Sequence, residues 1–262
     1  MPVQTIDEVI AALDTIVQQS YDNTSRLGYF AALYRRVTCA VRDGLAAGRF
    51  PNGPLLEKLD VIFASRYLDA LATFQAGGTA TRSWMLAFHA CADPTLLVLQ
   101  QLLAGMNAHI NLDLGVAAAQ TCPGSQLPQL KPDFDEINNL LAEQVGAVEA
   151  ELAAVSPLIG DLEKIGLRSE TSVINFSLDA ARNKAWLIAE YLANEPAALH
   201  NDSIDALDFG VSIEGRAILY PLAGREGLKI IQQAEVKDVR RVIEVLSQGS
   251  TGRPQTVNGN PG

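Results

Sequence analysis

The sequence has few of the residues that disulfide frameworks and zinc ribbons require. Its three cysteines, Cys39, Cys91 and Cys122, are an odd number, and none of them forms a CxxC pair. Cysteines used in this way are typical of small buried hydrophobic side chains in a reducing compartment. The first residues also lack the basic and then apolar segments of a secretory signal. We therefore expect a cytoplasmic protein without a disulfide framework.

Basic clusters and long apolar runs are also absent. The formal net charge is −10, and no run of Lys and Arg is longer than the pairs at 35–36 and 240–241. Binding to nucleic acid needs a basic face that neutralises phosphates, so we expect no nucleic-acid partner. A membrane span needs about 18 or more apolar residues in succession. The longest candidate, 96–119, is interrupted by Gln100, Gln101, Asn107, His109, Asn111 and Asp113. We therefore expect no membrane span.

The familiar motifs of hydrolases and nucleotide-binding proteins are missing as well. The sequence contains no GxSxG, no GxGxxG, no Walker A loop and no HExxH. It has three histidines, His89, His109 and His200. Candidate functional residues are therefore single polar side chains at positions where the helical pattern expects apolar ones.

The sequence is rich in helix-forming apolar residues. Hydrophobic residues make up 48% of the chain and charged residues 19%. Apolar residues recur at helical spacing, and no region alternates with the period of two that is typical of a strand. The sequence predicts an all-α protein, with a single multi-helix domain over 1–246 around a buried central helix, and a disordered polar tail over 247–262. The expected helices cover about 6–17, 27–47, 54–75, 81–92, 95–121, 133–155, 172–193, 202–220, 225–233 and 236–246.

The expected central helix carries two polar residues on its core-directed face. His109 and Asp113 are four residues apart and so share that face. Burying an imidazole and a carboxylate is costly unless they pair or bind a metal. An HxxxD pair can supply half of a site for one divalent metal ion, which Asp60, Asp69 or His89 would complete. It can equally be a plain hydrogen bond between the two side chains.

Two further side chains are candidates for a site. Arg182 either pairs with a carboxylate such as Asp179 or reaches into the same interior as Asp113, where its guanidinium would hold an anionic group. Asp60 shares a helical stripe with Tyr67. These two residues are expected either to form a buried hydrogen-bonded pair or to line a pocket.

Several segments resemble one protein family when they are taken together. They are the run A-H-I-N-L-D-L at 108–114 and the shorter pieces at 59–63, 66–70, 133–138 and 181–186. Over about 28–239 the chain resembles an uncharacterised bacterial all-helical family, a domain of unknown function, which implies a helical fold and no established activity. A weaker similarity is to zinc-dependent phospholipases and nucleases with HxxxD pairs on core helices. Three histidines are too few for their trinuclear site.

Three functions remain open on the sequence. The first is a metal-assisted hydrolase of a small or lipid-like substrate, in which His109 and Asp113 bind the metal and Arg182 holds an anionic group. The second is a non-enzymatic binding protein for a hydrophobic small molecule, with the same side chains as orienting contacts. The third is a purely structural buried network of these three residues. No sequence feature indicates the oligomeric state.

Overall fold

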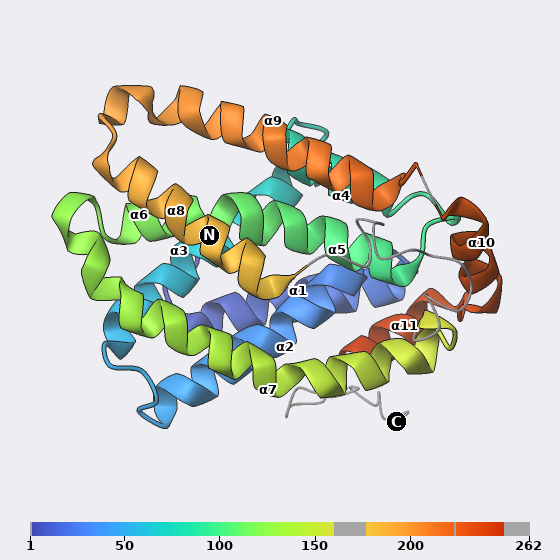
Figure 1. Ribbon diagram of the computed structural model, residues 1–262. Helices are drawn as coiled ribbons and strands as arrows, with labels where there is room; N and C mark the ends of the chain where they lie inside the picture. Colours follow the sequence, from blue (N-terminus) through green and yellow to red (C-terminus); the bar gives the residue numbers. More distant parts are fainter. Residues whose placement is uncertain (1, 160–176, 223, 249–262) are drawn as a thin grey trace.

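The structure is a computed structural model that describes residues 2–159, 177–222 and 224–248 (Figure 1). The described residues form helices and contain no β-strand, which confirms the all-α prediction. The helices are α1 (Ile6–Asp22), α2 (Leu27–Ala46), α3 (Gly53–Gln75), α4 (Arg82–Ala90), α5 (Val98–Ala108), the π-helical turn η1 (His109–Leu114), α6 (Gly115–Thr121), the 3-10 helix η2 (Gly124–Leu130), α7 (Lys131–Val155), α8 (Leu178–Asn194), the 3-10 turn η4 (Ala197–Leu199), α9 (His200–Leu219), α10 (Arg225–Ala234) and α11 (Val239–Leu246).

Local capping chemistry sets several of the helix ends. α1 begins after Thr5, whose hydroxyl accepts from the Glu8 amide at 3.2 Å, while the Glu8 carboxylate accepts from the Gln4 amide at 2.6 Å. Gly48 and Gly77 follow the ends of α2 and α3 with φ of +67° and +76°. Such left-handed conformations cost glycine little, so both helices end where the sequence predicts.

A buried central helix, made of α5, η1 and α6 end to end, is the axis of the fold, as predicted. Figure 1 shows α5 in the middle of the bundle, with α4 and α9 on one side and α2 on the other. α3 and α8 pack against η1 and α6. No helix of the described residues, this one included, combines the length and apolar character that crossing a membrane requires.

The structure differs from the predicted helices in several places. α1 continues to Asp22 instead of ending near 17, and α11 begins at Val239 instead of 236. The central helix was expected to be one α-helix over 95–121, but it begins at Val98 and changes to a π turn over 109–114. The expected loop at 122–132 contains η2, which runs directly into α7 and buries Leu127 and Leu130. The helix expected from 202 begins at His200, as α9. The start of the helix predicted at 172, and positions 249–262 of the predicted tail, lie outside the described residues.

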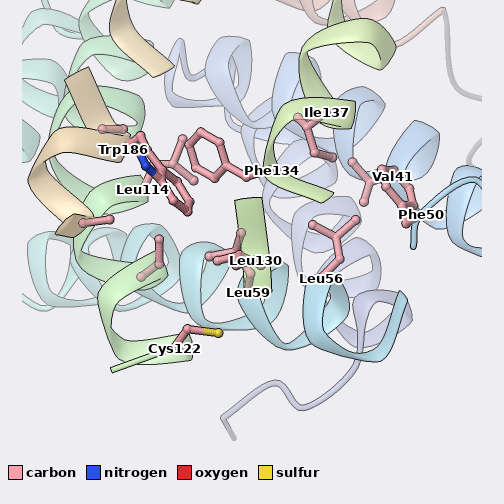
Figure 2. Close-up of a cluster of buried hydrophobic side chains, with 14 of the residues drawn as sticks. Val41, Phe50, Leu56, Leu59, Leu114, Cys122, Leu130, Phe134, Ile137 and Trp186 are labelled. Atoms are coloured by element: carbon pink, nitrogen blue, oxygen red, sulfur yellow. The ribbon is translucent and has the colours of Figure 1, made fainter. Parts of the chain in front are cut away.

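A large apolar cluster joins α3, η1, α7 and α8 (Figure 2). Phe134 of α7 lies against Trp186 of α8, with ring centroids 5.0 Å apart. Leu59, Leu114 and Leu130 belong to the same cluster. Full burial of a large apolar side chain stabilises the fold by about 1.5–3 kcal/mol. The cluster therefore holds in place the elements that carry the candidate site residues.

Candidate functional site

The π turn η1 places His109 and Asp113 in the centre of the molecule. Both side chains are buried, with 3% and 1% of their surface exposed. π turns are rare and are frequently found at functional sites. Glycines flank the turn because neighbouring helices approach closely. A Cβ at Gly105 would lie 2.6 Å from the Phe30 ring, and one at Gly115 would lie 2.6 Å from Ile188.

The Asp113 carboxylate is the acceptor on which three elements converge. Its Oδ1 accepts from Arg66 Nε of α3 at 2.7 Å, and its Oδ2 accepts from Trp84 Nε1 of α4 at 2.7 Å. His109 Nδ1 lies 3.4 Å from the same Oδ2. Arg182, for which contact with this network was one of two predictions, makes no hydrogen bond or ion pair with Asp113. Arg66 supplies the guanidinium instead.

These contacts determine which nitrogen of His109 carries the proton. Asp113 accepts from Arg66 and Trp84, so a lone pair on Nδ1 would face a carboxylate oxygen. We therefore assign the proton to Nδ1, which leaves Nε2 as an acceptor. Burial lowers the pKa of His109, so the ring is neutral. Nε2 is buried and has no hydrogen-bond partner.

Aromatic side chains hold the imidazole in this orientation. The Phe63 ring stacks on it with a centroid distance of 3.5 Å and an interplanar angle of 7°. The Tyr34 ring meets it edge-on, with centroids 4.5 Å apart. Phe30, Tyr67 and Trp84 complete the ring of aromatic neighbours within 6.2 Å. His109 thus has a fixed position with little freedom to rotate away from Asp113.

His109 lines a cavity of about 340 Å³. Its walls come from α2, α3, α5, η1, α7 and α8 and are almost entirely apolar. A volume of this size is within the range of small-molecule sites, about 300–1,000 Å³. The lining residues Val145 and Glu149 on α7 are exposed, so the cavity reaches the surface along α7.

Asp60 and Tyr34 are two more polar residues among those that line the cavity. Both side chains are buried, and Asp60 Oδ2 and Tyr34 Oη have no hydrogen-bond partner. Burial, with a smaller effect of Glu57, raises the pKa of Asp60 to about 7. Burial also raises the pKa of Tyr34. Asp60 and Tyr67 were predicted either to form a hydrogen-bonded pair or to line a pocket. Asp60 lines the cavity, whereas Tyr67 packs among aromatic rings and makes no hydrogen bond to Asp60.

Arg182 lines the same cavity from α8. Its Nη2 donates to the Phe134 carbonyl at 2.6 Å, its Nε donates to Asn138 Oδ1, and its guanidinium lies 4.4 Å from the Phe134 ring centroid. No carboxylate of the described residues lies within ion-pair distance of it. Burial lowers the pKa of Arg182 to about 10. Arg182 therefore ties α8 to α7 at the cavity wall.

The remaining predicted metal ligands do not join this site. His89 and Asp69 are exposed, and His89 packs edge-on against Phe74. Within the described ranges, no group of three or more His, Cys, Asp or Glu side chains is arranged to hold a metal ion. The structure thus brings His109 and Asp113 into contact and places Asp60 on the wall of the cavity that His109 lines. Among the described residues, neither Asp60 nor any other side chain joins the pair as a third metal ligand.

Comparison with known proteins places the chain in a family. Residues 6–221 match the model described as "Family of unknown function (DUF5995)". The chain belongs to the DUF5995 family. The match spans α1 to α9 and so includes every site residue described above. No curated protein and no solved structure matched. DUF5995 membership confirms the expected family of unknown function and lends no activity.

Three residues of this DUF5995 site were not predicted from the sequence. Arg66 and Trp84 contact Asp113 from other helices, and Tyr34 lies beside His109. Arg66 follows the apolar run at 61–64, which is a weak signal, whereas Tyr34 directly precedes Arg35 and Arg36 and gave no signal. Trp84 gave none, because an indole on an apolar face is usual in a core.

Proposed function

We propose that this DUF5995 protein binds an apolar small molecule that carries an uncharged oxygen group, a hydroxyl or a carbonyl. The observation that carries the proposal is a set of three buried polar atoms without partners on residues that line one apolar cavity. They are His109 Nε2, Asp60 Oδ2 and Tyr34 Oη. A few convergent polar groups in a largely apolar pocket are typical of small-molecule sites.

The energetic cost of the unpartnered groups favours a ligand over a purely structural network. A buried polar group without a partner costs about 1–3 kcal/mol. Three of them are a large fraction of a typical folding free energy of about 5–15 kcal/mol. Asp113, in contrast, has a donor on each oxygen and is satisfied without a ligand. The structural network therefore accounts for Asp113 and leaves the three cavity groups unexplained.

The chemistry of the polar groups selects the ligand. His109 Nε2 accepts only, while the Tyr34 hydroxyl and the protonated form of Asp60 can donate. A hydroxyl can satisfy both kinds of group, and a carbonyl can satisfy the two donors. Arg182 lines the same cavity and can supply a further polar contact. A metal-assisted hydrolase is not proposed, because the described ranges lack a three-ligand cluster for a metal.

Isothermal titration with a matched pair of probes tests the proposal. 2-Naphthol and 2-methylnaphthalene have nearly the same shape and differ in a hydroxyl against a methyl group. We expect 2-naphthol to bind at least about 10-fold more tightly, because one net hydrogen bond is worth about 1.4 kcal/mol. Equal affinities, or no saturable binding of 2-naphthol, would contradict the proposal.

A cavity-filling variant checks that the probe enters this cavity. Met106 lines it from α5, whereas Met85 on α4 does not. We expect Met106→Trp to abolish 2-naphthol binding and Met85→Trp to retain it. Thermal melting of both variants shows whether each is folded. Retained binding by folded Met106→Trp places the probe elsewhere and argues against this cavity.

A further inference from the structure

The polar groups of the cavity are chemically unlike one another. His109 Nε2 has a lone pair and no proton, and its other nitrogen faces Asp113. Tyr34 Oη carries a proton that no protein group accepts, and Asp60 Oδ2 has no donor that would hold it as a carboxylate. One group is therefore placed to receive a proton, and two are placed to donate hydrogen bonds.

These groups lie close together at one end of the cavity. The Tyr34 ring is 4.5 Å from the imidazole centroid. Asp60 is one helical turn before Phe63 on α3, and the Phe63 ring stacks on the imidazole at 3.5 Å. Tyr34 and Phe63 also contact each other, with centroids 6.1 Å apart. The three residues therefore border the same part of the cavity, which is where a ligand that contacts all three would lie.

We infer that this end of the cavity is a proton-transfer site for an apolar, enolisable ketone, an inference that rests on the binding function proposed above. His109 Nε2 is the base, Tyr34 and Asp60 donate hydrogen bonds to the carbonyl oxygen, and Asp113 is a positioning residue that acts through His109. Positioned bases and preorganised donors are the two standard means of stabilising an enolate-like transition state.

The proposed reaction is balanced without a cofactor. The C–H bond next to the carbonyl breaks, and its proton moves to His109 Nε2. Its electron pair forms the C=C bond of the enolate, and the carbonyl π electrons move to oxygen, which Tyr34 and Asp60 stabilise. Return of the proton to the same carbon gives exchange, and return to a conjugated carbon gives an isomer. His109 is regenerated in either case.

The ionisation of each group agrees with its role. Burial lowers the pKa of His109 and keeps it available as a neutral base, while it raises the pKa of Tyr34 and keeps the phenol protonated. The pKa of Asp60, raised to about 7, predicts that the reaction slows as pH rises through that value. The other charged or titratable groups around these three are Glu57 and Arg66 on α3, Tyr67 on α3, Asp113 in η1, Glu149 on α7 and Arg182 on α8.

The experiment follows proton exchange on a bicyclic ketone, 2-decalone, in D₂O by NMR. The intact protein is expected to exchange the protons next to the carbonyl faster than the same concentration of free imidazole does. We expect His109→Gln to slow exchange by about 100-fold or more and Tyr34→Phe by about 100-fold. Tyr29→Phe is the matched control, because Tyr29 is also buried on α2 but does not line the cavity, and its rate should be unchanged.

Asp113→Asn distinguishes positioning from a merely structural role. A positioning role predicts a large fall in the limiting exchange rate with little change in the half-saturating ketone concentration, in a variant shown by circular dichroism to be folded. His109→Gln and Tyr34→Phe carry the test if Asp113→Asn does not fold.

The binding titration separates the two proposals. Saturable 2-decalone binding with exchange no faster than free imidazole overturns the proton-transfer site and leaves the binding function intact. Exchange that His109→Gln leaves unchanged overturns it too. Failure of 2-naphthol to bind removes the binding function, and the proton-transfer site with it.

Discussion

Asp113 is the residue on which the buried network depends. It accepts from Arg66 and Trp84 at 2.7 Å each, and it faces His109 Nδ1. An amide can accept on one oxygen alone, so Asp113→Asn would place an NH₂ group against one of these donors. We expect a loss of roughly 2–4 kcal/mol in the free energy of unfolding, measured by urea denaturation.

Asp69→Asn is the control for this prediction. Asp69 lies on α3, the helix that carries Arg66, but its side chain is exposed. Its substitution should change the unfolding free energy by less than about 0.5 kcal/mol. An Asp113→Asn protein with an unchanged urea midpoint would show that the network contributes little to stability.

Asp60 gives the fold a distinct dependence on pH. Because its pKa is raised to about 7, the folded protein binds a proton more tightly than the unfolded chain does. This contribution is fully present below the unfolded pKa of about 3.9 and is lost as pH rises through about 7. Asp60→Asn removes the titration. We expect the free energy of unfolding of Asp60→Asn, minus that of wild type, to be larger at pH 8 than at pH 5 by at least about 1 kcal/mol.

Urea denaturation of both proteins at the two pH values measures this effect. The comparison with wild type cancels the contributions of all other titrating groups. If the difference in unfolding free energy between Asp60→Asn and wild type is equal at pH 5 and pH 8, Asp60 keeps an ordinary pKa. It is then more hydrated than its burial indicates.

At the scale of elements, the π turn is where the central helix departs from its predicted form. The sequence correctly predicted a buried helix with His109 and Asp113 on one face, because helical spacing of apolar residues is a local signal. It could not predict the π turn, which follows from contacts with other helices: Asp113 bonds to α3 and α4, and Gly115 lies against α8. Those contacts are absent from any local window of sequence.

Gly115 tests how tightly α8 holds the end of the π turn. An added Cβ would lie 2.6 Å from Ile188 Cγ2 and 2.8 Å from the Ala185 carbonyl oxygen, which is backbone and cannot rotate away. We expect Gly115→Ala to destabilise the protein by about 1–3 kcal/mol, measured by thermal melting.

Gly146→Ala is the opposite control. Gly146 lies within α7, and a Cβ there would meet nothing within 4 Å. Alanine favours the helix, so this variant should be more stable by about 0.5–1 kcal/mol. If Gly115→Ala were as stable as Gly146→Ala, α8 would have to be free to move away from the central helix.

At the scale of the whole molecule, the sequence predicted the class of fold better than it predicted the site. Apolar spacing and glycine ends recovered most helices, including α1, α2 and α3. The cavity could not be predicted, because it exists only where six elements fail to fill the space between them. Pairing across helices was equally hidden, so Arg66 and not Arg182 is the guanidinium at Asp113.

Both proposals require a neutral His109 whose unprotonated Nε2 is available to a ligand in the cavity. The most direct measurement is ¹⁵N NMR of the imidazole nitrogens, which is tractable because the chain has three histidines and His109→Gln identifies one of them. We expect a neutral ring protonated at Nδ1, whose Nε2 resonance shifts when 2-naphthol is added while those of His89 and His200 do not. A ring protonated at Nε2, or an Nε2 resonance indifferent to the probe, would contradict it.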